Sequence, residues 1–447
     1  MTHDQAQNDD VRMRGFARRA CVRDAVQWVD QHSQHSERTE RVEVAQASGR
    51  VLAEDIVSPL DVPPFDRSAM DGYAVRGDET TGATDYNPLV FRVLGEALPG
   101  RPFAGRVGPG SAVRIMTGAP MPDGADAVVP AEYAREVGPS VEITQAVPPR
   151  RHVGRRGEDV RSGTTVLPAG RRLRPQDVAL LAALGQAAVT VRQRPRVRLL
   201  ITGNELVAPG SERKQAQIYD SNSVMLQALV QRDGGELESV VRVADERDVI
   251  EAAMTRSGAD VVLVSGGSSV GAEDHAPVVL SQRGQLAVHG VAMRPSSPAG
   301  MGRLDDVLVF LLPGNPVSCL CAYDFFAGRA IRRIGGRPAE WPYRASRAVL
   351  TRKIASAIGR TDYCRVRLVD ANPLPDDASP IESAPVAYDG QRQDWPDAPV
   401  RQVEPVAVSG ASVLSSTTRA DGFLVVPESR EGFAPGDHVT VFLYDSV

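Results

Sequence analysis

The strongest constraint on the fold is the alternation of strand-like and helix-like segments between residues 195 and 336. Short continuous apolar runs, typical of fully buried strands, alternate with longer segments whose apolar residues recur at helical spacing. This alternation predicts a three-layer α/β domain with a mainly parallel sheet, in which ligands bind at the carboxyl ends of the strands. The expected strands are 197–202, 237–243, 260–264, 285–291 and 307–311, and the expected helices are 221–232, 247–256, 275–282 and 316–333.

Shorter β-type runs lie on both sides of this domain. Between residues 59 and 148 the runs 90–94 and 112–116 are separated by frequent Gly and Pro, which indicates a small β domain. Residues 337–447 are expected to form a β-barrel-like C-terminal domain that carries a long Pro/Asp/Ser-rich loop at 370–399. Its expected strands are 364–369, 403–408, 422–426 and 438–443. The predicted fold is therefore multidomain, α/β plus β.

The small β domain is expected to be an insertion into a discontinuous N-terminal domain, because residues 20–58 and 149–194 are similar in composition. A helical pattern runs through Val22, Val26 and Val29, a second segment spans 42–57, and a third, helical segment spans 175–184. Residues 1–19 are polar and without hydrophobic periodicity, and we expect them to form a loose tail.

Charge and composition exclude several classes of function. The 51 Lys and Arg against 56 Asp and Glu leave a net charge of -5, so the chain has no overall positive field that would bind nucleic acid or an anionic membrane. Lys214 and Lys353 are the only lysines, which argues against Schiff-base chemistry. Apolar runs fall far short of the roughly 20 residues that cross a bilayer, and the polar N-terminus has no signal core. We expect a cytoplasmic protein.

Glycine-rich or polar turns follow three of the predicted strands. Glycines beside small hydroxyl residues let backbone N–H groups approach an anion, and the next helix adds a favourable dipole. The turns predict a phosphate or oxyanion site, although they match neither the dinucleotide nor the Walker pattern. The turn residues expected to contact substrate are Gly266, Gly267, Ser269, Gly271, Gly314 and Asn315.

Three carboxylates, Glu205, Asp220 and Asp274, lie just beyond strand-to-helix junctions of the same sheet. One cleft could collect them, and hard oxygen ligands beside a phosphate site suit Mg²⁺. The alternative is that Asp220 and Asp274 only cap the helices that follow them. Both interpretations remain open at the level of sequence.

The segment 58–75 contains three acids, Asp61, Asp66 and Asp71, in a proline-constrained stretch. Taken alone, this composition is typical of a surface turn. It becomes specific only in combination with the segments RIMTGAP at 114–120 and RRGED at 155–159.

Seven motifs occur in a fixed order along the chain. They are SPLDVPPFDRSAMDGYAV, RIMTGAP, RRGED, TGNEL, IYDSNS, SGGSSVG and LPGNPVS. This set resembles the molybdopterin molybdenumtransferases of molybdenum-cofactor biosynthesis, the MoeA-type bacterial relatives of the gephyrin E domain. The resemblance covers about residues 20–447.

The resemblance implies a function and an assembly. Such proteins insert molybdenum from molybdate into adenylated molybdopterin and release AMP in a Mg²⁺-dependent reaction. They are elongated homodimers, and their active cleft lies between the α/β and C-terminal domains of one subunit and the β domain of the other. Other proteins of the cofactor pathway are possible partners. By motif position, the catalytic residues are Asp71, Thr117, Asp159, Glu205 and Asp274, and further substrate contacts are Arg294, Pro313, Pro316, Arg365 and Ser415.

The residue types at these positions suit that chemistry. The backbone around Gly266, Gly267 and Gly314 can hold a pyrophosphate link, while Mg²⁺ near the carboxylates offsets charge as AMP leaves. Molybdate is a dianion, so hydroxyl, backbone and arginine donors suit it and carboxylates do not. Asp71 and Asp159 are expected to position groups or handle protons. Arginines expected to balance negative charge are Arg155, Arg156 and Arg294.

One segment departs from the family pattern. Family members usually carry K-P-G-K-P where this chain has Arg294-Pro295-Ser296-Ser297-Pro298. Arg294 replaces the first lysine, but Ser297 leaves no cation at the second, a loss of about 1 to 3 kcal/mol of binding to an anionic substrate. A second hypothesis is therefore an impaired paralogue that binds molybdopterin or a partner protein without turnover. A third, an adenylyltransferase, shares the α/β domain but leaves the β domain without a role.

Overall fold

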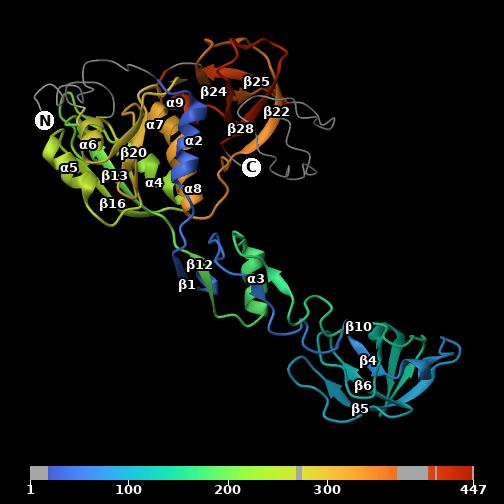
Figure 1. The fold of residues 1–447 in the computed structure, drawn as a ribbon. Helices are drawn as coiled ribbons and strands as arrows, with labels where there is room; N and C mark the ends of the chain where they lie inside the picture. The colour runs from blue at the N-terminus through green and yellow to red at the C-terminus, as the bar shows by residue number, and fades with distance from the viewer. Residues whose placement is uncertain (1–18, 268–273, 370–400, 408–409, 445–447) are drawn as a thin grey trace, which may run out of the picture. The chain divides into compact units, whose positions relative to one another are not determined.

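The computed structural model describes residues 19–267, 274–369, 401–407 and 410–444 (Figure 1). These residues form two compact units, one within 1–39 and 192–447 and the other spanning 40–191. The second unit is thus inserted into the sequence of the first. Every helix in the described ranges is too short or too polar to cross a bilayer.

A six-stranded sheet forms the centre of the α/β region, in the order β16-β13-β17-β21-β20-β18. The first four strands are parallel, and β20 is antiparallel to both of its neighbours. The predicted three-layer, mainly parallel architecture is confirmed. The sequence pattern missed β20 because its five residues, GMGRL, form no apolar run. The strands are β13 Arg196–Thr202, β16 Glu236–Val243, β17 Val261–Ser265, β18 Gln285–His289, β20 Gly300–Leu304 and β21 Val307–Leu312.

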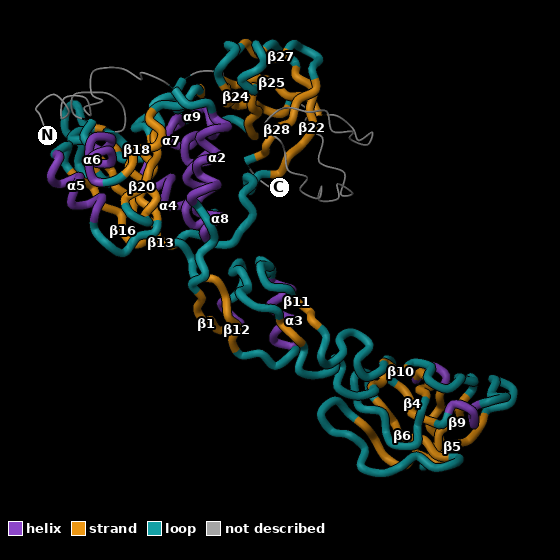
Figure 2. Tube along the Cα trace, in the orientation of Figure 1, coloured by secondary structure: helices purple, strands orange, loops and turns teal. Residues whose placement is uncertain are grey.

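Helices cover both faces of this sheet (Figure 2). Alternate strand residues point to opposite faces, so Leu199 and Leu263 join one core with α4, α7 and α8, whereas Leu200 and Val262 join another with α5 and α6. The stretch expected as one helix at 316–333 is continuous but contains a π-helical turn, η4. The helices are α4 Asn222–Arg232, α5 Arg247–Thr255, α6 Ala276–Arg283, α7 Pro316–Ala322, η4 Tyr323–Ala327 and α8 Gly328–Ile334.

Helix α2, Val22–His32, belongs to the α/β region rather than with residues 40–58, with which composition had grouped it. Its apolar stripe, which includes Val26 and Val29, lies in the same core cluster as α8. Asp30 at the edge of this stripe accepts hydrogen bonds of 2.6 and 2.8 Å from Arg329 of α8. Hydrophobic periodicity predicted the helix but not its partner.

The C-terminal region forms a closed barrel of five strands, β24-β25-β22-β28-β26, with β26 returning to β24. The barrel-like prediction is confirmed. Strand β19 pairs in parallel with β24 and so joins the barrel to the α/β region. The elements are β19 Met293–Arg294, β22 Arg344–Leu350, β23 Ile354–Ala355, β24 Thr361–Leu368, β25 Arg401–Ala407, α9 Ser415–Thr418, β26 Gly422–Val426, β27 Gly432–Phe433 and β28 His438–Leu443.

The inserted unit contains a six-stranded sheet, β7-β4-β6-β5-β9-β8, and smaller two-stranded pairings. The predicted small β domain is confirmed. The sheet strands are β4 Gly72–Val75, β5 Leu89–Ala97, β6 Ser111–Ile115, β7 Ala127–Pro130, β8 Ala134–Val137 and β9 Ser140–Ile143. The other elements are β1 Thr39–Glu43, η1 Val44–Gln46, β2 Ile56–Val57, β3 Arg67–Ser68, η2 Gly77–Thr80, η3 Ala131–Tyr133, β10 Val153–Gly154, β11 Thr165–Leu167, α3 Pro175–Ala183 and β12 Ala188–Arg192.

The segment 42–57 does not form an α-helix. It contains the end of β1, the 3-10 turn η1 and the short strand β2. Its buried apolar residues, among them Val44, Leu52 and Ile56, pack into one core with residues of α3 and β12. The spacing of apolar residues here therefore reflects this small core and not a helix face.

Candidate functional site

The glycine turns at the ends of β17 and β21 lie side by side. A Cβ added to Gly314 would lie 3.7 Å from the Cα of Gly266, and one added to Gly267 would lie 3.9 Å from Oδ1 of Asp274. Gly266 has φ +93°, and its Cβ would lie 2.2 Å from the carbonyl oxygen of Thr202, so no other residue fits there without strain. Three strand ends thus contribute backbone to one place, as the topology of parallel strands requires.

Beneath these turns lie polar side chains that the sequence analysis did not select. Thr202 Oγ1, Asn222 Oδ1 and Ser223 Oγ are buried and have no hydrogen-bond partner in the described part of the chain. Burying an unpaired polar group costs free energy, and functional sites are a common reason for retaining one. The TGNEL and IYDSNS motifs contained the signal, because each places a small polar residue at a strand end or helix start.

Asp220 behaves as a structural carboxylate. It is 1% exposed. Its Oδ1 accepts a 2.9 Å hydrogen bond from the backbone N of Ser223 in the first turn of α4, and its Oδ2 accepts one of 2.9 Å from Nε of Arg242. Both oxygens are occupied within the chain, which favours the helix-capping interpretation over the metal-ligand interpretation of this residue.

The other two carboxylates, those of Glu205 and Asp274, lie close to glycine residues of the turns. Glu205 is exposed, and its carboxylate lies 2.7 to 3.0 Å from where a Cβ on Gly203 would be. Asp274 lies beside Gly267 and precedes His275, the N-cap residue of α6. No group of three or more His, Cys, Asp or Glu side chains within the described residues could hold a metal ion. A Mg²⁺ ion here would need substrate oxygens or water to complete its shell, which is its usual manner of binding at phosphates.

Arg294 is bound to a carboxylate of the barrel. Its guanidinium hydrogen-bonds Asp362, which is fully buried and also accepts 2.8 Å bonds from Ser356 and Arg360. This ion pair neutralises part of the positive charge of Arg294, which was expected to balance the negative charge of the substrate. Ser297, at the position of the missing lysine, has a buried hydroxyl without a hydrogen-bond partner among the described residues.

The C-terminal region contributes differently from what the motifs predicted. Arg365 in β24 is fully buried, so it does not present its guanidinium to solvent. Ser415 is exposed and begins α9. The contact with the 313–316 turn is made three residues earlier, where Ser412 Oγ donates a 2.9 Å hydrogen bond to Oδ1 of Asn315. Pro316 occupies the first turn of α7, the position that suits proline.

In the inserted unit, two predicted catalytic residues contact each other. Oδ1 of Asp71 accepts hydrogen bonds from the backbone N of Thr117 at 2.6 Å and from its Oγ1 at 2.7 Å. These two bonds lower the pKa of Asp71 below its usual value. A carboxylate that accepts two bonds in its charged form suits positioning of the Thr117 turn better than proton donation.

The RRGED segment packs beside the acid-rich loop. The backbone N of Asp159 donates a 3.1 Å hydrogen bond to the carbonyl of Val62. Asp61 accepts bonds of 2.6 Å from Nε of Arg156 and 2.9 Å from the backbone N of Ser162, and these bonds lower its pKa. Asp159 itself is exposed. Arg156 is therefore engaged within its own loop, whereas the side chain of Asp159 faces solvent.

Some predicted positions cannot be placed. Ser269 and Gly271 of the SGGSSVG motif and the insertion 370–399 lie outside the described residues. Asp71, Thr117 and Asp159 belong to the unit 40–191, whereas Glu205, Asp274 and the glycine turns belong to the other unit. The predicted residues thus form two groups, each built within its own unit.

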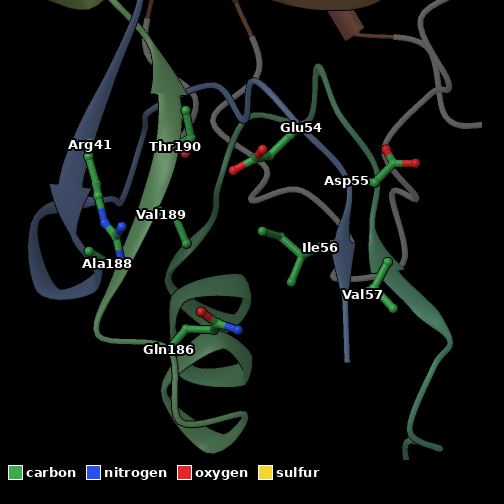
Figure 3. Close-up of a pocket in the computed structure, with 9 residues that line it drawn as sticks. All are labelled: Arg41, Glu54, Asp55, Ile56, Val57, Gln186, Ala188, Val189 and Thr190. Carbon is green, nitrogen blue, oxygen red and sulfur yellow. The ribbon is translucent and has the colours of Figure 1, made fainter. Parts of the chain in front are cut away.

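A separate hollow of about 240 Å³ lies in the inserted unit (Figure 3). Its polar lining comes from Arg41, Glu54, Asp55, Gln186 and Thr190, and apolar residues of β2 and β12 complete it. It contains none of the predicted site residues, and Asp55 already accepts a 2.7 Å bond from the backbone N of Ala169. The hollow is a surface feature of the small core between β12 and β2.

Models of protein families match most of the chain. Residues 20–185 match the "MoeA N-terminal region (domain I and II)", residues 198–333 the "Probable molybdopterin binding domain", and residues 393–444 the "MoeA C-terminal region (domain IV)".

Individual relatives agree with these models. The chain is 41% identical over 337 residues to molybdopterin molybdenumtransferase 2 of Mycobacterium tuberculosis, covering 73% of this chain and 82% of that protein. It is 33% identical over 402 residues to the molybdopterin molybdenumtransferase of Haemophilus influenzae, covering 89% and 91%. The crystal structure of the molybdopterin biosynthesis MoeA protein from Pyrococcus horikoshii superposes with a TM-score of 0.74 at 31% identity, covering 96% of this chain and 100% of that one.

Glycine turns, buried hydroxyls and carboxylates lie at the ends of parallel strands, in a chain that also contains a closed barrel and an inserted β domain, and these features define a multidomain α/β plus β protein. Taken with the comparisons, they give the family. The chain belongs to the molybdopterin molybdenumtransferases of the MoeA type, and it is an enzyme of molybdenum-cofactor biosynthesis, a transferase.

Proposed function

We propose that the protein inserts molybdenum from molybdate into adenylated molybdopterin and releases AMP. The observation that carries the proposal is the convergence of Gly266, Gly267, Gly314 and Asp274 at one edge of the sheet. Backbone N–H groups of such turns suit the oxygens of a phosphoanhydride, the bond that must break for AMP to leave. The hydroxyl of Thr202 lies directly beneath Gly266 and Gly267, has no hydrogen-bond partner among the described residues, and supplies a further donor.

Mg²⁺ fits this edge as a companion of the substrate. Glu205 and Asp274 are the carboxylates proposed to hold it, with phosphate oxygens and water as its other ligands. When bound, the ion would offset the negative charge that develops on the leaving AMP. The glycine turns orient the anhydride. Asn315 and Pro316 begin helix α7, which fixes the turn at 313–316.

The inserted unit is proposed to contribute the molybdate end of the reaction. Thr117 presents a hydroxyl held by Asp71, and Arg155 and Asp159 lie on the exposed RRGED loop. A tetrahedral dianion suits hydroxyl and guanidinium donors. From the family resemblance, we propose that the protein is a homodimer. We further propose that the reaction takes place in the cytoplasm, together with other proteins of the pathway.

The reaction is tested by incubating the purified protein with adenylated molybdopterin, Mg²⁺ and molybdate while AMP is measured. We expect AMP release that needs all three and that stops when EDTA removes the metal. Parallel incubations with tungstate and sulfate define the oxyanion, and one with ATP in place of the adenylated substrate tests for adenylyltransferase activity. Absence of AMP release with every metal and oxyanion would reject the proposed reaction. Sedimentation velocity of the purified protein tests separately whether it is a dimer.

A further inference from the structure

Asn222 links the two glycine turns from below. It is the first residue of α4 and 7% exposed. Its Nδ2 donates one hydrogen bond of 2.8 Å to the carbonyl oxygen of Gly314 and another of 2.9 Å to Oγ of Ser265, the last residue of β17. Both amide hydrogens are therefore used, one on each of two neighbouring strand ends.

The orientation of this amide is determined by its neighbours. The carbonyl of Gly314 can only accept, so the nitrogen and not the oxygen of the amide must face it. Ser265 Oγ, which accepts from Asn222, also lies 3.8 Å from the sulfur of Cys319, and either of these two groups can donate the hydrogen bond between them. Burial raises the pKa of the Cys319 thiol to about 12, so this group is neutral. The bonds connect α4, β17, the 313–316 turn and α7.

The same turn is held from the other side by the C-terminal region. Ser412 Oγ donates to Oδ1 of Asn315, and the backbone N of Val317 donates a 3.0 Å bond to the carbonyl of Ala411. The turn between Pro313 and Pro316 is exposed at Gly314 and Asn315, and such a turn would otherwise be free to shift. Two side chains, one buried and one at the surface, fix its position.

We propose that Asn222 is a positioning residue which, assisted by Ser412, sets the distance between the backbones of Gly314 and Gly266. The inference rests on the proposed function, because it takes this distance to determine how tightly the phosphoanhydride binds. Asn222 acts through the turn and its side-chain nitrogen has no hydrogen left for a ligand. Backbone donors at two turns bind an anhydride well only when their spacing matches the separation of its oxygens.

Three variants test this role. Asn222→Ala removes both bonds, and Ser412→Ala removes the outer one. Asn87→Ala is the matched control, because Nδ2 of Asn87 also donates to a glycine carbonyl, that of Gly82 at 3.1 Å, in an exposed turn of the inserted unit. Amide hydrogen exchange of the peptide 309–320 is measured with KM and kcat for AMP release.

We expect Asn222→Ala to speed exchange in this peptide about tenfold and to raise KM for the adenylated substrate about tenfold, with kcat within about threefold of the wild type. Ser412→Ala should change both quantities about threefold, because its bond is exposed. The control should change neither. Unchanged exchange in Asn222→Ala, or faster exchange with an unchanged KM, overturns the inference.

If the wild-type protein releases no AMP, the proposed function fails, and hydrogen exchange still decides whether Asn222 holds the turn. If Asn222→Ala does not fold, Ser412→Ala decides the question, because Ser412 is exposed and its loss leaves the core intact. If Ser412→Ala leaves both hydrogen exchange and KM unchanged, the proposal that these side chains fix the position of the turn is rejected.

Discussion

The two groups of motif residues are built in opposite ways. At the edge of the α/β sheet, Thr202, Asn222 and Ser223 are buried polar residues, and each retains an atom without a partner in the described chain. Around Asp71 and Thr117 in the inserted unit, the residues are exposed, and the carboxylate is bonded to its neighbour. In the first group, the free-energy cost of removing polar atoms from water is incurred before any ligand binds. In the second group, the polar atoms remain in contact with water and carry no such cost.

This difference teaches what each group can contribute. Buried donors with fixed spacing bind one arrangement of oxygens and disfavour others, because reorganising them is costly. Exposed loop residues can adapt but provide less binding energy until water is removed. We therefore expect substitutions at the sheet edge to affect stability and substrate binding together, and substitutions in the loops to affect chemistry with little effect on folding.

The largest effect is expected for Gly266→Ala. A methyl group there would lie 2.2 Å from the carbonyl oxygen of Thr202 at a positive φ, so we expect a loss of about 2 to 4 kcal/mol in the free energy of unfolding. Gly314→Ala is the matched control, because its methyl group would meet nothing closer than 3.7 Å, and its stability should change by less than about 0.5 kcal/mol. Urea unfolding followed by circular dichroism measures both, and equal losses would contradict the geometry.

A somewhat smaller effect is expected at Asp220. Asp220→Ala removes a helix-start acceptor and leaves Arg242 without its partner, at a cost of about 2 to 3 kcal/mol. Asp220→Asn keeps the acceptor and should lose about 1 kcal/mol. Thermal unfolding with and without Mg²⁺ checks this. Variants that unfold like the wild type but need more Mg²⁺ would instead restore the metal-ligand interpretation.

Ser297→Lys tests the charge of the sheet edge. Because Arg294 is already paired with Asp362, an added cation should lower KM for the anionic substrate by up to about tenfold, equivalent to roughly 1.4 kcal/mol, with little change in kcat. AMP release measures this, and Ser297→Gln is a control of similar length without charge. A rise in kcat from near background would identify the natural chain as an impaired paralogue.

The smallest effect concerns Thr117→Val in the inserted unit. The variant loses the hydroxyl bond to Asp71 and keeps the backbone bond, so the pKa of Asp71 should rise toward its usual value. A lowered pKa stabilises the folded state above the unfolded-state pKa, about 3.9, and this contribution is lost as the pH falls through the folded-state value. Carbon NMR titration of the carboxylate follows the change. Thr81→Val is the control, because its hydroxyl bonds a backbone carbonyl, and an unchanged pKa in Thr117→Val would show that the backbone bond alone is sufficient.

The sequence predicted the sheet edge well because strand order and side-chain alternation are local properties. Residues that follow β13, β17 and β21 must meet at one edge, so the proximity of Gly266 and Gly314 could be expected from the runs that precede them. The role of Asn222 could not, because it depends on which acceptors lie within 3 Å of one amide nitrogen.

The loops of the inserted unit were less predictable for a physical reason. Asp71 and Thr117 are 46 residues apart and meet only because β4 pairs with β6. Strand β4 has no local signature, because it lies at the end of a proline-constrained segment whose composition is typical of a turn. Likewise, Asp220 was open between two roles until the position of Arg242 on the neighbouring strand was known.

The chain leaves the first unit after residue 39 and re-enters it at residue 192. The backbone N of Gln193 bonds the carbonyl of Arg38 at 2.9 Å, and Arg192 bonds the carbonyl of Ser36 at 3.1 Å. Exit and re-entry are therefore adjacent, and a short connector could replace residues 40–191 at little cost in loop entropy. We therefore expect the unit 40–191 to be exchangeable between homologues, while the other unit keeps its own fold.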